Sequence, residues 1–165
     1  MYKILVAEDD KDIRNILKDS LEEEFEDVVV EVAVDGRQAL EMASRNEYVV
    51  IASDIKMPHL SGIEFLRKLR EQQNYTPFLI ITGHGDLPHA VEALRMGAID
   101  FINKPFDMNR VFESVSIGMN LGSRIINFNN AIDELKEKGE LSPEEIDRLQ
   151  KLNMYMANLN NKKVG

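Results

Sequence analysis

The sequence predicts an α/β fold in which a five-stranded parallel sheet is covered by helices on both faces. Three observations support this prediction. The apolar runs are short and rich in β-branched residues, segments with helical spacing separate them, and the two kinds of segment alternate five times by about residue 124. Such alternation implies parallel strands joined by right-handed crossovers, which is a doubly wound domain.

Three of the expected strands are short, unbroken apolar runs rich in β-branched residues, and two further apolar segments extend the series to five. Runs without polar alternation suit strands that are buried on both faces of a parallel sheet. They lie at residues 3–7, 28–34, 48–53, 78–82 and 100–103.

Each expected helix carries apolar residues three or four positions apart, which form one stripe for covering the sheet. Asp10 is expected to cap the first helix, Gly97 to end the fourth, and Asn109 to open the fifth. The fifth helix, residues 109–126, carries apolar residues on two faces, which predicts a second packing partner in addition to the sheet.

Composition limits the classes of function. The formal net charge of -9 argues against non-specific binding to DNA or to an anionic membrane, since both need a basic face. The absence of cysteine excludes disulfides, thiolate catalysis and cysteine-based metal sites. We see no apolar run near twenty residues and no secretion signal, so the expected location is the cytoplasm.

Polar residues follow four of the expected strands. Ligands of doubly wound folds bind at the carboxyl ends of the strands, so these residues are the first candidates for a site. They are Glu8, Asp9 and Asp10 after the first strand, Asp54 after the third, Thr82 at the end of the fourth and Lys104 after the fifth.

Carboxylates from two neighbouring strands repel one another, and a divalent cation would relieve the repulsion. Oxygen ligands without histidine or cysteine favour Mg²⁺ over Zn²⁺, with Asp9 and Asp54 as direct ligands. We assign Asp10 to the helix cap. Nucleotide binding is disfavoured because the glycines at 83 and 85 lack the spacing of a phosphate-binding loop.

Four motifs, in this order and at these spacings, resemble the receiver domain of bacterial two-component response regulators. They are ILVAEDD at 4–10, SDIKMPHLSG at 53–62, ITGHGD with AVEALRMGAIDF at 81–101, and NKPF at 103–106. The resemblance covers residues 1–124, implies a flavodoxin-like fold, and is closest in wording to receivers of the nitrogen-regulation type.

The resemblance implies that Asp54 accepts a phosphoryl group from a histidine of a sensor kinase. Asp9 would bind Mg²⁺ directly, Glu8 through water, and the backbone carbonyl of Lys56 would be a third protein ligand. Lys104 would supply a cation to the phosphoryl group.

Thr82 and Phe101 would be the switch hydroxyl and the switch aromatic, and the Lys104–Pro105 bond is expected to be cis. Lys56 and His84, two positions past Asp54 and Thr82, are weaker candidates for tuning hydrolysis of the phosphoryl group. The residues alone would favour a plain core aromatic at Phe101 and a surface loop residue at His84.

Residues 125–165 form an expected C-terminal helical extension. A short helix around residues 131–135 should end at Gly139, and Ser142, Pro143 and Glu145 form a strong start signal for a second helix. The resulting hairpin is interpreted as packing on the receiver or pairing with a second chain; the alternative is a cut linker that happens to be helical.

The expected partners are a sensor histidine kinase or a phosphotransfer protein, and then a downstream protein or a second copy. The contact surface would be the fourth helix, the fifth strand, a face of the fifth helix, or the extension. The main alternative is the receiver part of a DNA-binding transcriptional regulator. A Mg²⁺-dependent phosphatase is less favoured, since Lys56 stands where an acid–base aspartate would be required.

Overall fold

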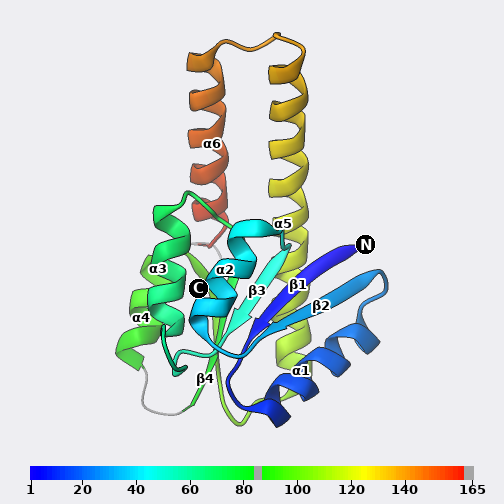
Figure 1. The fold of residues 1–165 in the computed structure, drawn as a ribbon, viewed down its shortest axis with the longest axis vertical. Helices are drawn as coiled ribbons and strands as arrows, with labels where there is room; N and C mark the ends of the chain where they lie inside the picture. The colour runs from blue at the N-terminus through cyan, green and yellow to red at the C-terminus, as the bar shows by residue number, and fades with distance from the viewer. Residues whose placement is uncertain (84–86, 162–165) are drawn as a thin grey trace.

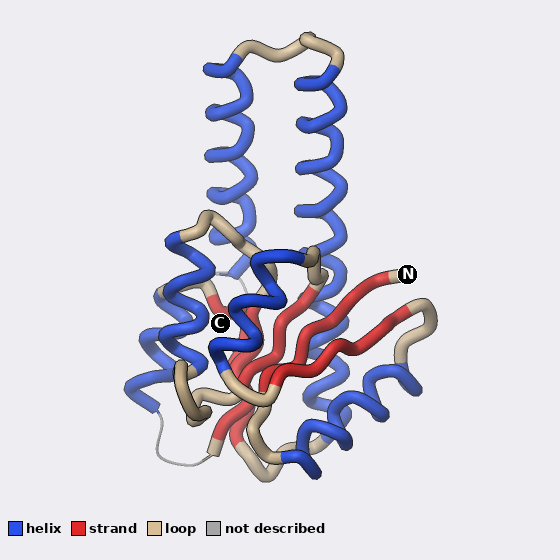
Figure 2. The backbone as a smooth tube through the Cα atoms, viewed as in Figure 1, coloured by secondary structure: helices blue, strands red, loops and turns tan. Residues whose placement is uncertain are grey.

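The computed structural model describes residues 1–83 and 87–161, and at its centre lies a five-stranded parallel sheet (Figure 1). Across the sheet the strand order is β2-β1-β3-β4-β5, with every neighbouring pair parallel. Figure 2 shows the strands of the sheet in red, surrounded by the helices in blue. The predicted doubly wound fold is therefore confirmed. The strands are β1 (Tyr2–Ala7), β2 (Val28–Ala33), β3 (Val50–Ser53), β4 (Phe78–Thr82) and β5 (Ala98–Asn103).

Helices cover both faces of the sheet, and each face has its own buried apolar cluster. On one face lie α1 (Lys11–Glu24) and α5 (Met108–Glu137); on the other lie α2 (Gly36–Arg45), α3 (Gly62–Glu71) and α4 (Leu87–Arg95) (Figure 1). Every residue of β3 and β4 is buried, because these strands are flanked by other strands and covered from both sides.

The chain changes direction between β1 and β3. From β1 it crosses to β2 at the edge and then returns to β3 on the other side of β1. Ala7 pairs in register with Ser53, so the residues that follow these two strands are neighbours in space. In open α/β sheets this switch point is where ligands bind.

Helix starts follow from the local sequence. The Asp10 carboxylate accepts hydrogen bonds from the backbone nitrogens of Asp12 and Ile13, at 2.9 and 3.0 Å, which confirms its predicted role as the cap of α1. Gly97 has a φ of 84°, as expected for the residue that follows α4. The start predicted for α5 is wrong by one residue, since the helix begins at Met108 and its N-cap is Asp107.

The expected break near residue 126 is also absent, because α5 runs without interruption to Glu137. Residues 127–130 contain neither proline nor glycine, so nothing interrupts the helical hydrogen bonds. The three asparagines of this segment are weak helix formers, but they do not break the helix. The expected domain boundary at residue 124 therefore falls inside a helix.

A glycine allows α5 to pass close to the sheet. A Cβ atom added to Gly122 would lie 1.9 Å from the carbonyl oxygen of Val49, at the amino end of β3. Beyond this contact the second half of α5 projects away from the sheet as one arm of a hairpin (Figure 1).

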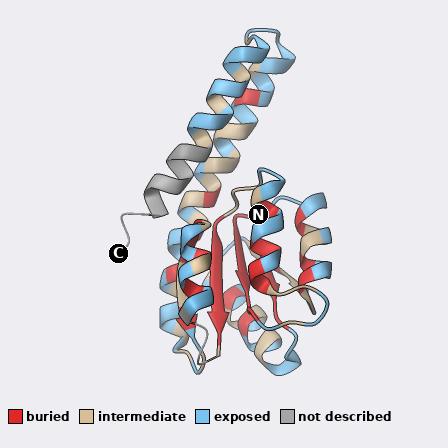
Figure 3. Cartoon of the chain, turned by 90° about the vertical axis from the view of Figure 1, so that its left-hand side faces the viewer, coloured by how far each residue is buried: buried red, intermediate tan, exposed pale blue. Residues whose placement is uncertain are grey.

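The other arm is α6 (Pro143–Asn161), which confirms the predicted hairpin. Ser142 and Glu145 form the expected capping box: the Ser142 nitrogen donates to Glu145 Oε2 at 2.9 Å, and the Glu145 nitrogen donates to Ser142 Oγ at 3.3 Å. Asn153 Nδ2 donates to Asn129 Oδ1 across the two arms at 2.8 Å. Most described residues of the hairpin are exposed or intermediate, although Ile132 is buried (Figure 3).

The membrane-spanning potential of the helices can be judged for residues 1–83 and 87–161. Among them no helix combines the length and the apolar character needed to cross a membrane. His84, one of the two candidates for tuning hydrolysis, lies outside the described residues.

Candidate functional site

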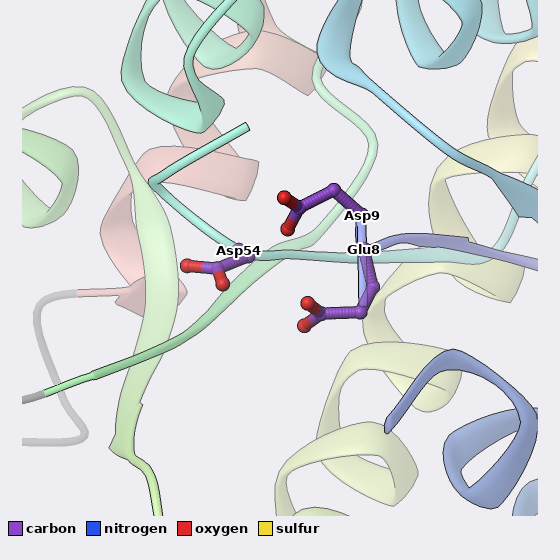
Figure 4. Close-up of side chains that lie close together, drawn as sticks. All are labelled: Glu8, Asp9 and Asp54. Atoms are coloured by element: carbon purple, nitrogen blue, oxygen red, sulfur yellow. The ribbon is translucent and has the colours of Figure 1, made fainter. Parts of the chain in front are cut away.

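Three carboxylates meet at the switch point. Glu8 and Asp9 follow β1, Asp54 follows β3, and one oxygen from each lies within 4.8 Å of the others (Figure 4). Glu8 and Asp54 are buried, whereas Asp9 is exposed. The sequence predicted this convergence because parallel strands bring their carboxyl ends to one edge.

Sheet and turn contacts fix the backbone of Asp54. Its nitrogen donates to the carbonyl oxygen of Ala7 at 2.9 Å, which continues the pairing of β3 with β1. The Ser53 hydroxyl donates to the Asp54 carbonyl oxygen at 2.8 Å. A Cβ atom at Gly62 would lie 2.0 Å from that carbonyl oxygen, so only glycine fits where α3 begins. Asp54, the nucleophile predicted from the sequence, is thus held by backbone contacts with β1 and the start of α3.

Lys104 bridges two of the carboxylates. Its Nζ donates to Asp54 Oδ2 at 2.6 Å and to Glu8 Oε2 at 2.7 Å. Burial alone would lower the pKa of Lys104, but the hydrogen bonds and charges of Asp54 and Glu8 outweigh burial and raise it. The ammonium group is therefore charged at neutral pH.

Glu8 behaves differently because its burial dominates. Loss of solvent raises the pKa of the Glu8 carboxyl, and the Asp54 charge acts in the same direction, whereas Lys104 opposes both. Asp10 adds a backbone hydrogen bond to Glu8 Oε1 at 3.2 Å. A cation placed between these acids would favour their ionised forms.

Two donors contact the other oxygen of Asp54. The Thr82 hydroxyl donates to Asp54 Oδ1 at 2.7 Å, and the backbone nitrogen of Lys56 donates to the same oxygen at 3.2 Å. Thr82 is fully buried at the end of β4. The Lys56 contact is made by its N–H group, whereas the resemblance pointed to its carbonyl as a metal ligand, and that carbonyl role stays a prediction.

Phe101 lies on β5 and does not belong to the cluster of carboxylates. Its side chain is half-buried and packs against the apolar cluster on the α2, α3 and α4 face. The Lys104–Pro105 bond that follows β5 is cis, as expected. Of the sequence-predicted site residues that the structure describes, all except Phe101 therefore lie around Asp54.

Sequence reasoning missed a polar network next to Phe101. Asp100 Oδ2 accepts hydrogen bonds from the Ser114 hydroxyl and from Arg110 Nη2, each at 2.5 Å. Arg110 and Ser114 are four residues apart on α5, and an aspartate within an apolar strand was the available signal. The network joins β5 to the first turns of α5.

The donor set at the switch point fits a hard divalent cation. It offers carboxylate oxygens and no histidine or cysteine, which suits Mg²⁺ or Ca²⁺ better than Zn²⁺. Asp9 is exposed, so an ion bound there could keep water ligands as Mg²⁺ usually does.

Comparison with known proteins agrees with this geometry. Residues 4–116 match the family model described as the response regulator receiver domain. The chain is 33% identical over 160 residues to the C4-dicarboxylate transport transcriptional regulatory protein DctD of Pseudomonas aeruginosa. The matched region covers 95% of this chain and 34% of that protein. It is 37% identical over 115 residues to the response regulator ArlR of Staphylococcus saprophyticus, which covers 70% of this chain and 51% of that protein.

Solved structures show the same fold. The receiver domain of the Francisella response regulator 1452 has a TM-score of 0.67 and 36% identity, with 73% of this chain and 98% of that chain covered. The receiver domain of NtrX from Brucella abortus has a TM-score of 0.65 and 31% identity, with 71% of this chain and 98% of that chain covered. This chain spans between one third and about one half of the length of the two curated relatives named above.

Proposed function

The chain belongs to the response regulator receiver domain family, and from this premise we propose that Asp54 accepts a phosphoryl group in a reaction that requires Mg²⁺. The observation that carries the proposal is the environment of the Asp54 carboxylate. Thr82 and Lys104 donate to its two oxygens, and oxygens of Glu8 and Asp9 lie within 4.8 Å. A receiver is a phosphoacceptor in signalling, not an enzyme acting on an external substrate.

The proposed reaction transfers the phosphoryl group from a donor histidine. One Asp54 oxygen attacks phosphorus, the bond from phosphorus to the imidazole nitrogen breaks, and the nitrogen keeps the electron pair. Asp9 and Asp54 would hold Mg²⁺ directly, Glu8 through water, and the Lys56 carbonyl would complete the protein ligands. Bound there, the ion supplies positive charge that offsets the charge of the transferring oxygens.

Lys104 and Thr82 would then contact the acyl phosphate. The Lys104 ammonium already lies 2.6 Å from the attacking carboxylate, so it can follow one of the new phosphoryl oxygens with a small movement. The Thr82 hydroxyl can turn from Asp54 Oδ1 to another phosphoryl oxygen, which would vacate space for Phe101. The switched surface would be the region of α4 and β5.

The partner that this function implies is a sensor histidine kinase or a phosphotransfer protein. Downstream, the contact would be made by α4, β5, a face of α5 or the hairpin, with a target protein or a second copy. We keep residues 1–124 as the receiver and 125–165 as its extension, a division of roles along the continuous α5. Because α5 belongs to both parts, a conformational change of the receiver on phosphorylation would reach the extension through this helix.

Incubation with acetyl phosphate and Mg²⁺, followed by intact mass measurement, tests the proposal. The wild type should gain one phosphoryl group, and Asp54→Asn, which keeps the size of the side chain, should gain none. Chelation of the metal should prevent the gain in the wild type. A wild type that stays unmodified, or equal modification of Asp54→Asn, would contradict the assignment of Asp54.

A second candidate function is the receiver part of a DNA-binding transcriptional regulator. It is favoured by the match to a transcriptional regulatory protein that extends over 160 residues and so includes the hairpin region. The hairpin region itself is a poor DNA reader, because residues 125–165 hold 6 basic and 7 acidic residues. An electrophoretic shift of DNA that appears only after phosphorylation would support this candidate; its absence at low salt would count against it.

A further inference from the structure

Two consecutive acids point to one place in the candidate site. In an extended strand, the side chains of consecutive residues lie on opposite faces of the sheet. Glu8 and Asp9 are consecutive, yet an oxygen of each lies within 4.8 Å of the same Asp54 oxygen (Figure 4). The backbone must therefore leave the strand geometry between these two residues, and something must hold it there.

Arg14 contacts the backbone at this bend. A single atom of its guanidinium, Nη1, donates to the carbonyl oxygen of Glu8 at 2.7 Å and to that of Asp9 at 3.1 Å. Successive carbonyls of a strand point in opposite directions, so one nitrogen cannot reach both in extended backbone. The two hydrogen bonds from Arg14 Nη1 therefore mark the backbone bend that brings the Glu8 and Asp9 carboxylates together.

The donor stands on a fixed element. Arg14 lies in the second turn of α1, and Leu17 and Leu21 of the same helix are buried against the sheet. The start of α1 is fixed by Asp10, which caps it. The short segment from β1 to α1 is thus bonded to its own helix by the cap and by the guanidinium.

We propose that Arg14 is a positioning residue for the divalent cation site: it holds the Glu8–Asp9 bend through two backbone carbonyls and so aims both carboxylates at Asp54. This inference rests on the proposed function, in which those carboxylates serve Mg²⁺. Because Arg14 bonds carbonyl oxygens in these two contacts, it orients the acids without occupying the carboxylate oxygens that a metal needs. Groups that orient metal ligands from behind commonly change metal affinity by about 10- to 100-fold.

The test measures the dissociation constant for Mg²⁺ by calorimetry, with Arg14→Met as the main variant. Methionine keeps most of the aliphatic stem but donates no hydrogen bond, so we expect Mg²⁺ to bind about tenfold more weakly. Hydrogen exchange of the metal-free protein gives a second measurement. The Asp10 amide, which donates to Glu8 Oε1, should exchange faster in Arg14→Met.

Lys18→Met is the matched control. Lys18 is one turn further along α1 and donates to a carbonyl oxygen, that of Val30, at 3.1 Å. Its contacts are with Val30 and Glu22, away from the acidic segment, so its loss should lower stability while leaving Mg²⁺ affinity unchanged. Arg14→Lys, which retains one donor and a charge, should bind with intermediate affinity and provides the comparison if Arg14→Met does not fold.

The outcomes separate this inference from the proposed function. A wild type that binds no Mg²⁺ would overturn both. A wild type that binds Mg²⁺, with Arg14→Met or Arg14→Lys equal to it, would overturn the role of Arg14 alone. If Lys18→Met weakens Mg²⁺ binding as much as Arg14→Met does, the role of Arg14 is also overturned, because the weaker binding would then reflect lower stability and not loss of the bend.

Discussion

Replacement of Lys104 by methionine should tighten the binding of Mg²⁺ while preventing efficient phosphorylation. The Lys104 ammonium donates hydrogen bonds to both buried carboxylates, to Asp54 at 2.6 Å and to Glu8 at 2.7 Å. A metal ion must share those oxygens with the ammonium. Without Lys104 the acids keep their mutual repulsion, which only a proton or a metal can relieve.

The magnitude follows from charge and distance. Opposite unit charges about 4 Å apart interact by about 4 kcal/mol at an effective dielectric constant near 20. Desolvation of the partly buried groups offsets most of this attraction. We expect a net gain of about 1.4 to 2.8 kcal/mol in metal binding, which corresponds to about 10- to 100-fold in the dissociation constant. Metal-free Lys104→Met should unfold more easily than the wild type, and Mg²⁺ should recover part of the loss.

Thermal unfolding across a Mg²⁺ titration measures both effects, and intact mass after acetyl phosphate measures the reaction. Lys3→Met is a matched control, because Lys3 pairs with Glu31 at 2.7 Å far from the site and should change stability without changing Mg²⁺ affinity. If Lys104→Met binds Mg²⁺ no more tightly than the wild type, Lys104 does not compete with the metal and the electrostatic reasoning is refuted.

Three further predictions concern stability. Gly122→Ala should lower the free energy of unfolding by about 1 to 3 kcal/mol in chemical denaturation, because its Cβ would lie 1.9 Å from the Val49 carbonyl oxygen. The control is Ser116→Ala at an exposed position of the same helix, which should leave the free energy of unfolding unchanged. If Gly122→Ala also leaves it unchanged, the close approach of α5 to β3 is contradicted. Arg70→Met should lower the free energy of unfolding by about 2 to 4 kcal/mol, because the guanidinium donates to the carbonyl oxygens of Asn74, Thr76, Met96 and Gly97. The control Arg67→Met loses an exposed ion pair with Glu92 and should lower it by less than about 1 kcal/mol. Equal losses of stability in the two variants would refute the argument. Hydrogen bonds from Lys3 and then Tyr48 lower the pKa of Glu31 below 4.5, so its contribution to stability is present above that pH and is lost as the pH falls through the lowered value. Denaturation between about pH 6 and about pH 3 should show a shallower acid dependence in Glu31→Gln, and an identical slope would rule out this contribution.

Arg70, which is partly buried, shows how the fold uses a charge that the sequence leaves unexplained. Burial lowers the pKa of Arg70 to about 10, which is still well above neutral pH, so the group remains charged. Its guanidinium donates hydrogen bonds to carbonyl oxygens of the α3–β4 and α4–β5 connections. Arginine on an amphipathic helix is normally read as a solvent-exposed residue, and no spacing rule identifies this exception.

Local signals were sufficient for most of the receiver. Apolar runs identified the five strands, and helical spacing identified the covering helices, because side-chain periodicity directly reflects which faces are buried. Asp10 and Gly97 were predicted correctly because caps depend on a few neighbouring residues. At the site, the proximity of Asp54, Glu8 and Asp9 could be predicted because parallel strands end at a common edge of the sheet.

The errors have a different physical origin. The continuous α5 could not be predicted, because asparagines near residue 128 weaken a helix locally while the contacts of α6 and the sheet stabilise it. The Asp100 network depends on side chains from a strand and a helix, and the contacts of Arg14 depend on a backbone bend. None of these contacts leaves a periodic pattern in the sequence.

The sequence by itself determined the order of strands and helices along the chain, the family, and the residue types at the carboxyl ends of the strands, because these depend on local pattern and spacing. Tertiary structure decided how the residues act on one another: Lys104 between Asp54 and Glu8, Arg14 on the two carbonyls, and Gly122 against Val49. Contacts between residues distant in the chain are set by the packing of whole elements, and only the folded chain brings such residues within bonding distance.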